Sequence, residues 1–101
     1  MTVLKFSDQA KEDLKNLAAY TLNTWGEDQL QKYREQLKSA FVQLSEMPKS
    51  GRPRDDIRSG YRSLPVAEHV IFYRLESNGD VQIIAIPHSK RDPSQHMTET
   101  S

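Results

Sequence analysis

The sequence predicts one small α+β domain in which a hairpin of two helices packs on an antiparallel sheet. Three observations support this prediction. The 101 residues are enough for one hydrophobic core and too few for two. Apolar residues recur at three- and four-residue steps through the first half of the chain, and β-rich runs follow in the second half. The resulting element order is β-α-α-β-β-β, which is typical of a two-layer α+β fold.

The first predicted elements are a short strand at 2–6 and a helix that follows it directly. Residues 2–6 are mostly β-branched or apolar, and Ser7 is a favourable helix N-cap, followed by acidic residues that the helix dipole stabilises. From Ala10 onwards the apolar positions form a helical stripe that stops at Gly26. The stripe consists of Leu14, Leu17, Ala18, Thr21, Leu22 and Trp25.

A second helix is predicted between Glu27 and Pro48. Its first turn is acidic, and its apolar residues recur until Pro48, which cannot continue a helix. These residues are Leu30, Tyr33, Leu37, Ala40, Phe41 and Leu44. Because only Gly26 joins the two helices, we expect them to fold back as an antiparallel pair.

Three strands are predicted after a charged loop at 49–60, in which Ile57 is the one strongly apolar residue. Asn78-Gly79 is a typical hairpin turn between the last two strands, and Pro87 ends the final one. The predicted strands are 61–66, 69–76 and 81–86.

Both faces of the strand at 69–76 carry apolar side chains, so the helices can cover only one face. One face carries Val70 and Phe72 and the other carries Ile71, Tyr73 and Leu75, and we interpret whichever face the helices leave uncovered as a partner-binding surface. The alternative is that the loop at 49–60 or the C-terminal tail covers it. Residues 93–101 are polar and lack periodicity, so they are expected to form a flexible tail after a single domain at 1–92.

Composition excludes several classes of protein. The chain has no cysteine, which excludes disulfides and thiolate chemistry and fits the reducing cytoplasm. No apolar run approaches the roughly 18 residues of a membrane span. The 14 basic residues balance 14 acidic ones, which argues against a protein that coats nucleic acid by bulk charge. We therefore expect a cytoplasmic protein without membrane contact.

The arginines are concentrated in the second half of the chain. From Lys49 to Arg74 there are six basic and three acidic residues, a local excess of three that fits an acidic protein segment better than nucleic acid. The alternative is that Asp55 and Asp56 pair with arginines of their own loop. After residue 51 the arginines are Arg52, Arg54, Arg58, Arg62, Arg74 and Arg91.

The three histidines do not have the spacing of a metal site. Only His88, which precedes Lys90 and Arg91, has a chemically suggestive setting, because an imidazole beside two cations can serve RNA cleavage. A structural role at a strand end is the alternative. The sequence also lacks Gly-x-Ser-x-Gly and any nucleotide-binding glycine loop, so no cofactor or metal is expected.

Three spaced segments resemble the ParE branch of the RelE/ParE toxin superfamily. They are GRPRDDIRSGYRSLPV at 51–66, HVIFYR at 69–74 and IAIPHSKRD at 84–92. Residues 10–14, Trp25-Gly26 and Pro48 extend the resemblance upstream, so that it covers residues 3–92. One departure is Pro87, where the family more often has Leu; because Pro has no backbone N–H, strand pairing is expected to end early there.

The resemblance implies the toxin of a type II toxin–antitoxin system, bound and neutralised by a cognate ParD-like antitoxin in a hetero-oligomer. ParE-type toxins typically inhibit DNA gyrase and so block replication, whereas RelE-type relatives cut mRNA in the ribosome. We favour a gyrase inhibitor that acts by protein binding, is not an enzyme and makes no sequence-specific nucleic-acid contact. A RelE-like ribosome-dependent endoribonuclease and an inactive antitoxin-binding relative are the alternatives.

Residues are assigned to these roles as hypotheses. The predicted target-binding residues are Tyr61, Arg62, His88, Lys90 and Arg91. The predicted antitoxin-binding residues are Arg52, Arg54, Arg58, Arg74, Phe72 and Tyr73. In the nuclease alternative the catalytic residues are His88, Lys90, Arg91 and Arg62.

Overall fold

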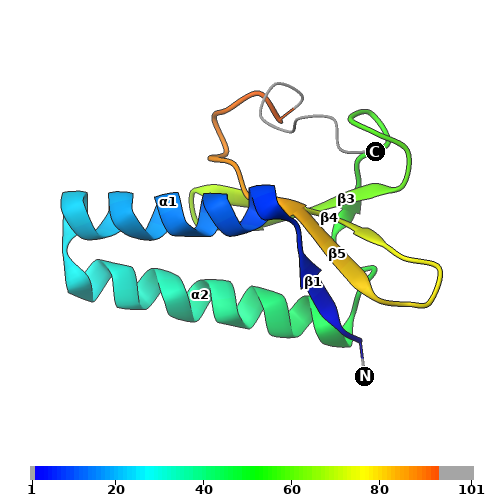
Figure 1. Ribbon diagram of the computed structural model, residues 1–101, viewed down its shortest axis with the longest axis horizontal. Helices are drawn as coiled ribbons and strands as arrows, with labels where there is room; N and C mark the ends of the chain where they lie inside the picture. The colour runs from blue at the N-terminus through cyan, green and yellow to red at the C-terminus, as the bar shows by residue number, and fades with distance from the viewer. Residues whose placement is uncertain (1, 94–101) are drawn as a thin grey trace.

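A computed structural model describes residues 2–93 as two antiparallel helices packed against a five-stranded sheet (Figure 1). In chain order the elements are β1 (Leu4–Phe6), α1 (Asp8–Trp25), α2 (Glu27–Glu46), β2 (Arg52–Pro53), β3 (Tyr61–Val66), β4 (His69–Leu75) and β5 (Val81–Ala85). The predicted α+β class is confirmed. The predicted tail at 93–101 falls, apart from Pro93, outside the described residues.

The sheet has the strand order β1-β5-β4-β3-β2 and is mixed. β3, β4 and β5 are antiparallel as predicted, but β1 pairs with β5 in parallel. The antiparallel sheet predicted from the three C-terminal strands is therefore confirmed, and β1 adds a parallel edge strand to it. Parallel pairing needs a long connection, and the helices and strands between β1 and β5 supply one. The two-residue β2, which pairs with β3, lies in the segment predicted to be a loop.

The helix boundaries follow from the predicted caps. The Ser7 side chain accepts a hydrogen bond from the backbone N–H of Ala10 at 3.0 Å. Gly26 has a φ of 92°, which favours glycine, and its N–H donates to the carbonyls of Thr21 and Leu22 at the end of α1. This single residue reverses the chain between the helices.

The larger core lies between the helices and the sheet. Its fully or nearly buried members are Ala10, Leu17, Tyr33, Leu37, Ala40, Leu44, Val66, Ile71, Tyr73, Val81, Ile83 and Ile86. Leu22 and Trp25 are 42% and 65% exposed, so the predicted apolar stripe of α1 is wrong at its end. The reason is visible in Figure 1, where the hairpin end of the two helices projects past the sheet.

A smaller core on the other face of the sheet contains Tyr61, Phe72, Ile84 and Ala85, with Ile57 and Val70 packed against it. A β-bulge makes it possible. The register steps from Phe72 opposite Ala85 to Tyr73 opposite Ile83, which leaves Ile84 as an extra residue. Because of this extra residue, the consecutive residues Ile84 and Ala85 both lie in the smaller core, whereas Ile86 lies in the larger one.

Candidate functional site

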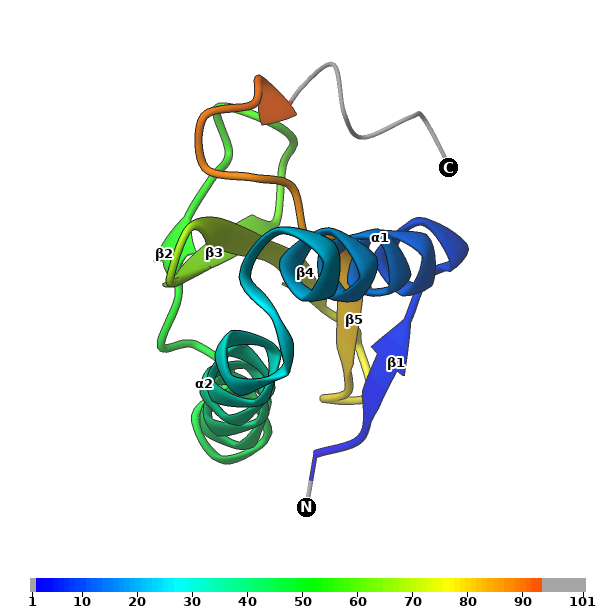
Figure 2. The same cartoon turned by 90° about the vertical axis from the view of Figure 1, so that its left-hand side faces the viewer.

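The loop between β2 and β3 covers the second face of the sheet. Figure 2 shows this loop on the side of the sheet away from α2. Arg54 donates from Nε and Nη2 to the carboxylate of Asp56 at 3.0 and 3.1 Å, and its guanidinium carbon lies 5.3 Å from the centre of the Phe72 ring. Phe72 is consequently only 2% exposed. The interpretation of this face as an open partner surface is wrong, because the loop packs on it.

Tyr73 and Arg62 hold the chain between α2 and β2 against the sheet. The Tyr73 hydroxyl accepts a hydrogen bond from the N–H of Gly51 at 2.9 Å and donates to the carbonyl of Pro48 at 2.7 Å. Arg62 Nη1 donates to the carbonyls of Gly51 and Lys49 at 2.7 and 3.2 Å. Burial raises the pKa of Tyr73, whose side chain has no exposed surface. Tyr73 is therefore a core residue, which corrects its assignment to an exposed antitoxin surface.

Three of the predicted antitoxin-binding residues, Arg52, Arg58 and Arg74, are exposed. Arg74 lies opposite Tyr61 on β3 and Gln82 on β5, and Arg52 lies opposite Ser63. Arg54 differs from them because its hydrogen bonds lower the pKa of Asp56. Arg54 therefore stabilises its own loop through Asp56, whereas the side chains of Arg52, Arg58 and Arg74 are exposed.

The five predicted target-binding residues do not form one cluster. Tyr61 and Arg62 begin β3, whereas His88 forms an isolated bridge with His69 at the far end of the β3–β4 pair. A six-residue strand separates these ends by about 17 Å. Tyr61 is also buried, and Arg62 is bound to backbone carbonyls. Lys90 and Arg91 are exposed beside His88.

The structure places His88 in a ring cluster that the sequence analysis did not identify. The His69 ring packs edge-to-face between Tyr33 and His88, with centroid separations of 5.4 and 5.2 Å. The Tyr33 hydroxyl is hydrogen-bonded to His69 Nδ1 and donates to the carbonyl of Val66 at 3.3 Å. The hairpin register carried a signal for this contact, since His69 and His88 each lie nine positions from the Asn78-Gly79 turn.

Burial dominates the electrostatics of this cluster. It raises the pKa of Tyr33 to about 12, with the charge of Glu68 acting in the same direction, so the phenol stays neutral. Burial also lowers the pKa of His69, and the charge of His88 lowers it further. A cavity of about 400 Å³ opens beside the two histidines and is bordered by the exposed aromatics Tyr20 and Trp25.

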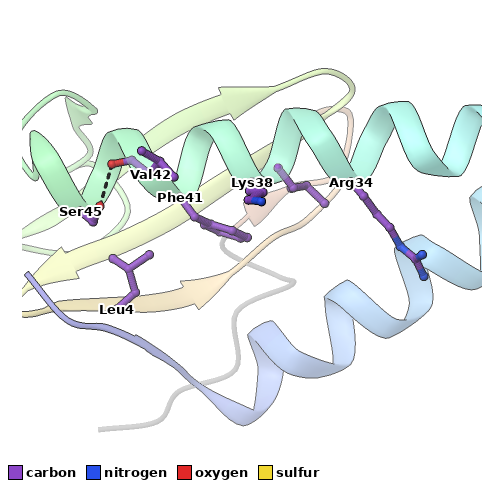
Figure 3. A pocket seen from close by; sticks show the side chains of 7 residues that line it. Leu4, Arg34, Lys38, Phe41, Val42 and Ser45 are labelled. Carbon is purple, nitrogen blue, oxygen red and sulfur yellow. Dashed lines mark hydrogen bonds between the residues drawn. The ribbon is translucent and has the colours of Figure 1, made fainter.

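A second groove runs between β1 and α2 (Figure 3). We call it the basic groove; it is formed by Leu4, Arg34, Leu37, Lys38, Phe41, Val42 and Ser45 and has a volume of about 360 Å³. Its floor is apolar, and Val42 is 46% exposed. Arg34 and Lys38 are one helical turn apart, so both charges lie at the same groove. Sequence reasoning missed it because β1 and α2 are brought together only by the fold.

Two findings bear on other kinds of site. Among residues 2–93, no three His, Asp or Glu side chains come together in a way that could hold a metal ion. No described helix is both long enough and apolar enough to span a membrane.

The two-helix layer on a β1-β5-β4-β3-β2 sheet places the chain among proteins with the RelE/ParE toxin fold. A solved chain from the chromosomal ParDE toxin–antitoxin system of P. aeruginosa superposes with a TM-score of 0.74 at 20% identity, covering 89% of this chain and 98% of that one. A chain of the toxin–antitoxin complex RelBE2 from Mycobacterium tuberculosis gives a TM-score of 0.51 at 20% identity, covering 86% and 96%.

Sequence comparison makes the identification specific. Residues 4–93 match the family described as the ParE toxin of the type II toxin–antitoxin system parDE. The chain is 31% identical to Toxin ParE1 of Mycobacterium tuberculosis over 91 residues, which are 90% of this chain and 93% of that protein. It is also 31% identical to Toxin ParE1 of Caulobacter vibrioides over 97 residues, which are 96% and 99%. The chain belongs to the ParE toxin family.

Proposed function

We propose that this ParE-family protein inhibits DNA gyrase by direct binding and so blocks replication, and that a cognate ParD-like antitoxin neutralises it in a hetero-oligomer. Membership of the ParE toxin family supports the toxin role. The observation that favours binding over RNA cleavage is the separation of the nuclease candidates. Arg62 donates hydrogen bonds to the carbonyls of Lys49 and Gly51, and it lies about 13 Å along β3 from the strand end next to His69 and His88.

The contacts of His88 also favour protein binding over RNA cleavage. Its Nδ1 accepts a hydrogen bond from the Lys90 N–H at 3.1 Å, and its ring packs on His69. General acid–base catalysis of RNA cleavage needs an imidazole beside cations that neutralise the developing charge on one phosphate. Arg62 cannot join Lys90 and Arg91 at such a phosphate without breaking its own hydrogen bonds.

The basic groove is the surface that we assign to the antitoxin. Its apolar floor accepts hydrophobic side chains, and Arg34 and Lys38 at its border favour a segment with acidic residues. A segment that folds as it binds fits such a surface. Arg52, Arg58 and Arg74 remain proposed as further contacts for its acidic residues.

A supercoiling assay with purified gyrase tests the proposal. The toxin should inhibit supercoiling and accumulate cleaved DNA, adding the antitoxin should relieve both effects, and ribosome-bound mRNA should stay intact. Replacing Lys90 and Arg91 together by Ala should weaken inhibition by about tenfold if this segment binds the target.

The nuclease alternative makes the opposite prediction. Cleavage of ribosome-bound mRNA that disappears in His88→Ala, with unchanged gyrase activity, would overturn the proposed function. Expression of the protein without its antitoxin is a second test. A folded chain that accumulates without inhibiting growth would contradict any toxin role.

A further inference from the structure

The residues after β5 are hydrogen-bonded to the chain at the start of β4, beside the edge-to-face rings of His69 and His88. The N–H of Val70 donates to the carbonyl of Pro87 at 3.0 Å, and the N–H of Ser89 donates to the carbonyl of Glu68 at 2.8 Å. The His69–His88 ring contact lies between these two hydrogen bonds. Two rings whose centres are 5.2 Å apart therefore lie at the point where residues 87–91 are attached to β4.

The turn that follows His88 requires a neutral ring. His88 Nδ1 accepts the N–H of Lys90 at 3.1 Å, and the carbonyl of His88 accepts the N–H of Arg91 at 2.9 Å. A ring nitrogen that accepts a hydrogen bond carries no proton, so the neutral ring has its proton on Nε2. An imidazolium has protons on both nitrogens, and protonation therefore removes the bond to Lys90.

The protonated form of His69 is disfavoured by burial and by the charge of His88, and not by the loss of a hydrogen bond. The Tyr33 hydroxyl can pair with either form of His69, because it can donate to Nδ1 or donate to the Val66 carbonyl and accept from Nδ1. The hydrogen bond to Tyr33 is thus insensitive to the proton. Burial and the neighbouring charge of His88 lower the pKa of His69, while Glu68 and Asp13 act in the opposite direction.

Charged and titratable groups face the histidine pair from every element packed against it. Of the carboxylates, Asp13 already accepts the N–H of Ile86 at 2.8 Å and a side-chain N–H of Gln9 at 2.9 Å, and Glu68 is exposed. The cations of the C-terminal segment add to the positive charge when the rings are protonated. Among residues 2–93 these groups are Asp13 and Tyr20 on α1, Tyr33 on α2, Glu68 in the β3–β4 turn, and Lys90 and Arg91 after β5.

We propose that His69 and His88 form a proton-sensitive clasp, which holds residues 87–91 against the start of β4 when both rings are neutral and releases them when the rings are protonated. Two imidazolium rings in contact repel each other, and the His88 turn loses its hydrogen bond. This inference goes beyond the proposed function and is independent of which target the protein binds.

The direction of the pH dependence follows from the histidine pair. An unfolded His has a pKa of about 6.5, and the pKa of folded His69 is lower, so the released state takes up more protons. The clasp is fully stable above about pH 6.5 and weakens as the pH falls through the pKa of folded His69.

Amide hydrogen exchange of the full chain at pH 7.5 and pH 5.5 tests the clasp. After correction for intrinsic exchange rates, protection of the Ser89 and Arg91 amides relative to that of Ile83 should fall by about tenfold at the lower pH. Ile83 in β5 reports on the core, so the ratio separates local release from global unfolding.

His88→Asn is the matched variant. An Asn side-chain oxygen can accept the N–H two residues later and does not titrate, so this variant should keep the turn and reduce the pH dependence to the part that His69 contributes. His69→Gln should reduce the pH dependence in the same way if His88→Asn fails to fold, and His96→Gln should leave it unchanged. Constant protection of Ser89 and Arg91 in the natural chain, or full pH dependence in a folded His88→Asn or His69→Gln variant, would overturn the proposal.

Discussion

Two regions of this protein carry basic side chains next to apolar ones, and the two use their charges differently. In the loop between β2 and β3, Arg54 pairs with Asp56 and covers Phe72. At the basic groove, Arg34 and Lys38 form no ion pair with any of residues 2–93, and Val42 of α2, which lines the groove, is half exposed. A cation that is already paired offers little to a partner, whereas an unpaired cation beside apolar surface offers both charge and contact area.

The difference follows from sequence distance. Arg54 and Asp56 are two residues apart, so this ion pair forms within the loop itself. Leu4 and Phe41 come together only when β1 packs beside α2. We infer that the loop contributes to folding stability and that the basic groove contributes to partner binding.

The largest expected effect concerns the charges of the basic groove. Replacing Arg34 and Lys38 together by Glu should weaken antitoxin binding by about 100-fold, because acidic residues of the antitoxin would then face like charges. Both side chains are exposed, so the free energy of unfolding should change by less than about 0.5 kcal/mol. Isothermal titration calorimetry with the antitoxin and chemical denaturation of the free toxin measure the two quantities.

A matched pair on the other helix provides the control. Lys11 and Lys15 are exposed, lie one turn apart on α1 and do not border the basic groove. Replacing both by Glu changes the net charge by the same amount and should leave the antitoxin affinity within about threefold of the original. Equal losses in the two double variants would mean that overall charge, and not the groove, determines the affinity.

The next effect concerns the stability of the chain near the loop. A methyl group at Gly51 would lie 2.5 Å from the Tyr73 hydroxyl oxygen and 2.7 Å from the Ser63 carbonyl oxygen. Gly51→Ala should therefore lower the free energy of unfolding by about 2 kcal/mol, since the overlap displaces backbone and a buried phenol. Ser50→Ala, at an exposed neighbour, is the control for thermal or urea unfolding. A Gly51→Ala protein as stable as the control would contradict the tight packing at this position.

The boundaries of the elements were largely predictable because local signals determine them. Ser7 caps α1, Gly26 separates the helices, and Asn78-Gly79 forms the turn before β5. β5 ends before Pro87 as predicted, but pairing with β4 continues beyond it, since Val70 donates to the Pro87 carbonyl and His69 forms a bridge with His88. The parallel direction of β1 was not predictable from local sequence, because it depends on which sheet edge the helical hairpin leaves available.

The candidate site was less predictable than the fold. Sequence patterns identified the arginines, but they could not tell that Arg62 binds backbone carbonyls or that Tyr73 is buried. These properties arise from residues distant in the chain. His69 and the basic groove were missed for the same reason, although the count from the hairpin turn offered a usable signal for the His69–His88 contact.

The smallest expected effect tests whether the paired arginine of the loop, Arg54, takes part in antitoxin binding. Arg54→Gln removes the ion pair with Asp56, so the pKa of Asp56 should rise towards its ordinary value, which carboxyl NMR titration measures. Antitoxin affinity should stay within about threefold, because the charge that is lost was already paired. Arg74→Gln, an exposed arginine that does not contact Asp56, should leave the pKa of Asp56 unchanged. If Arg54→Gln instead weakens antitoxin binding by tenfold or more while the pKa of Asp56 stays low, the loop arginine binds the partner directly and the division between the two regions is wrong.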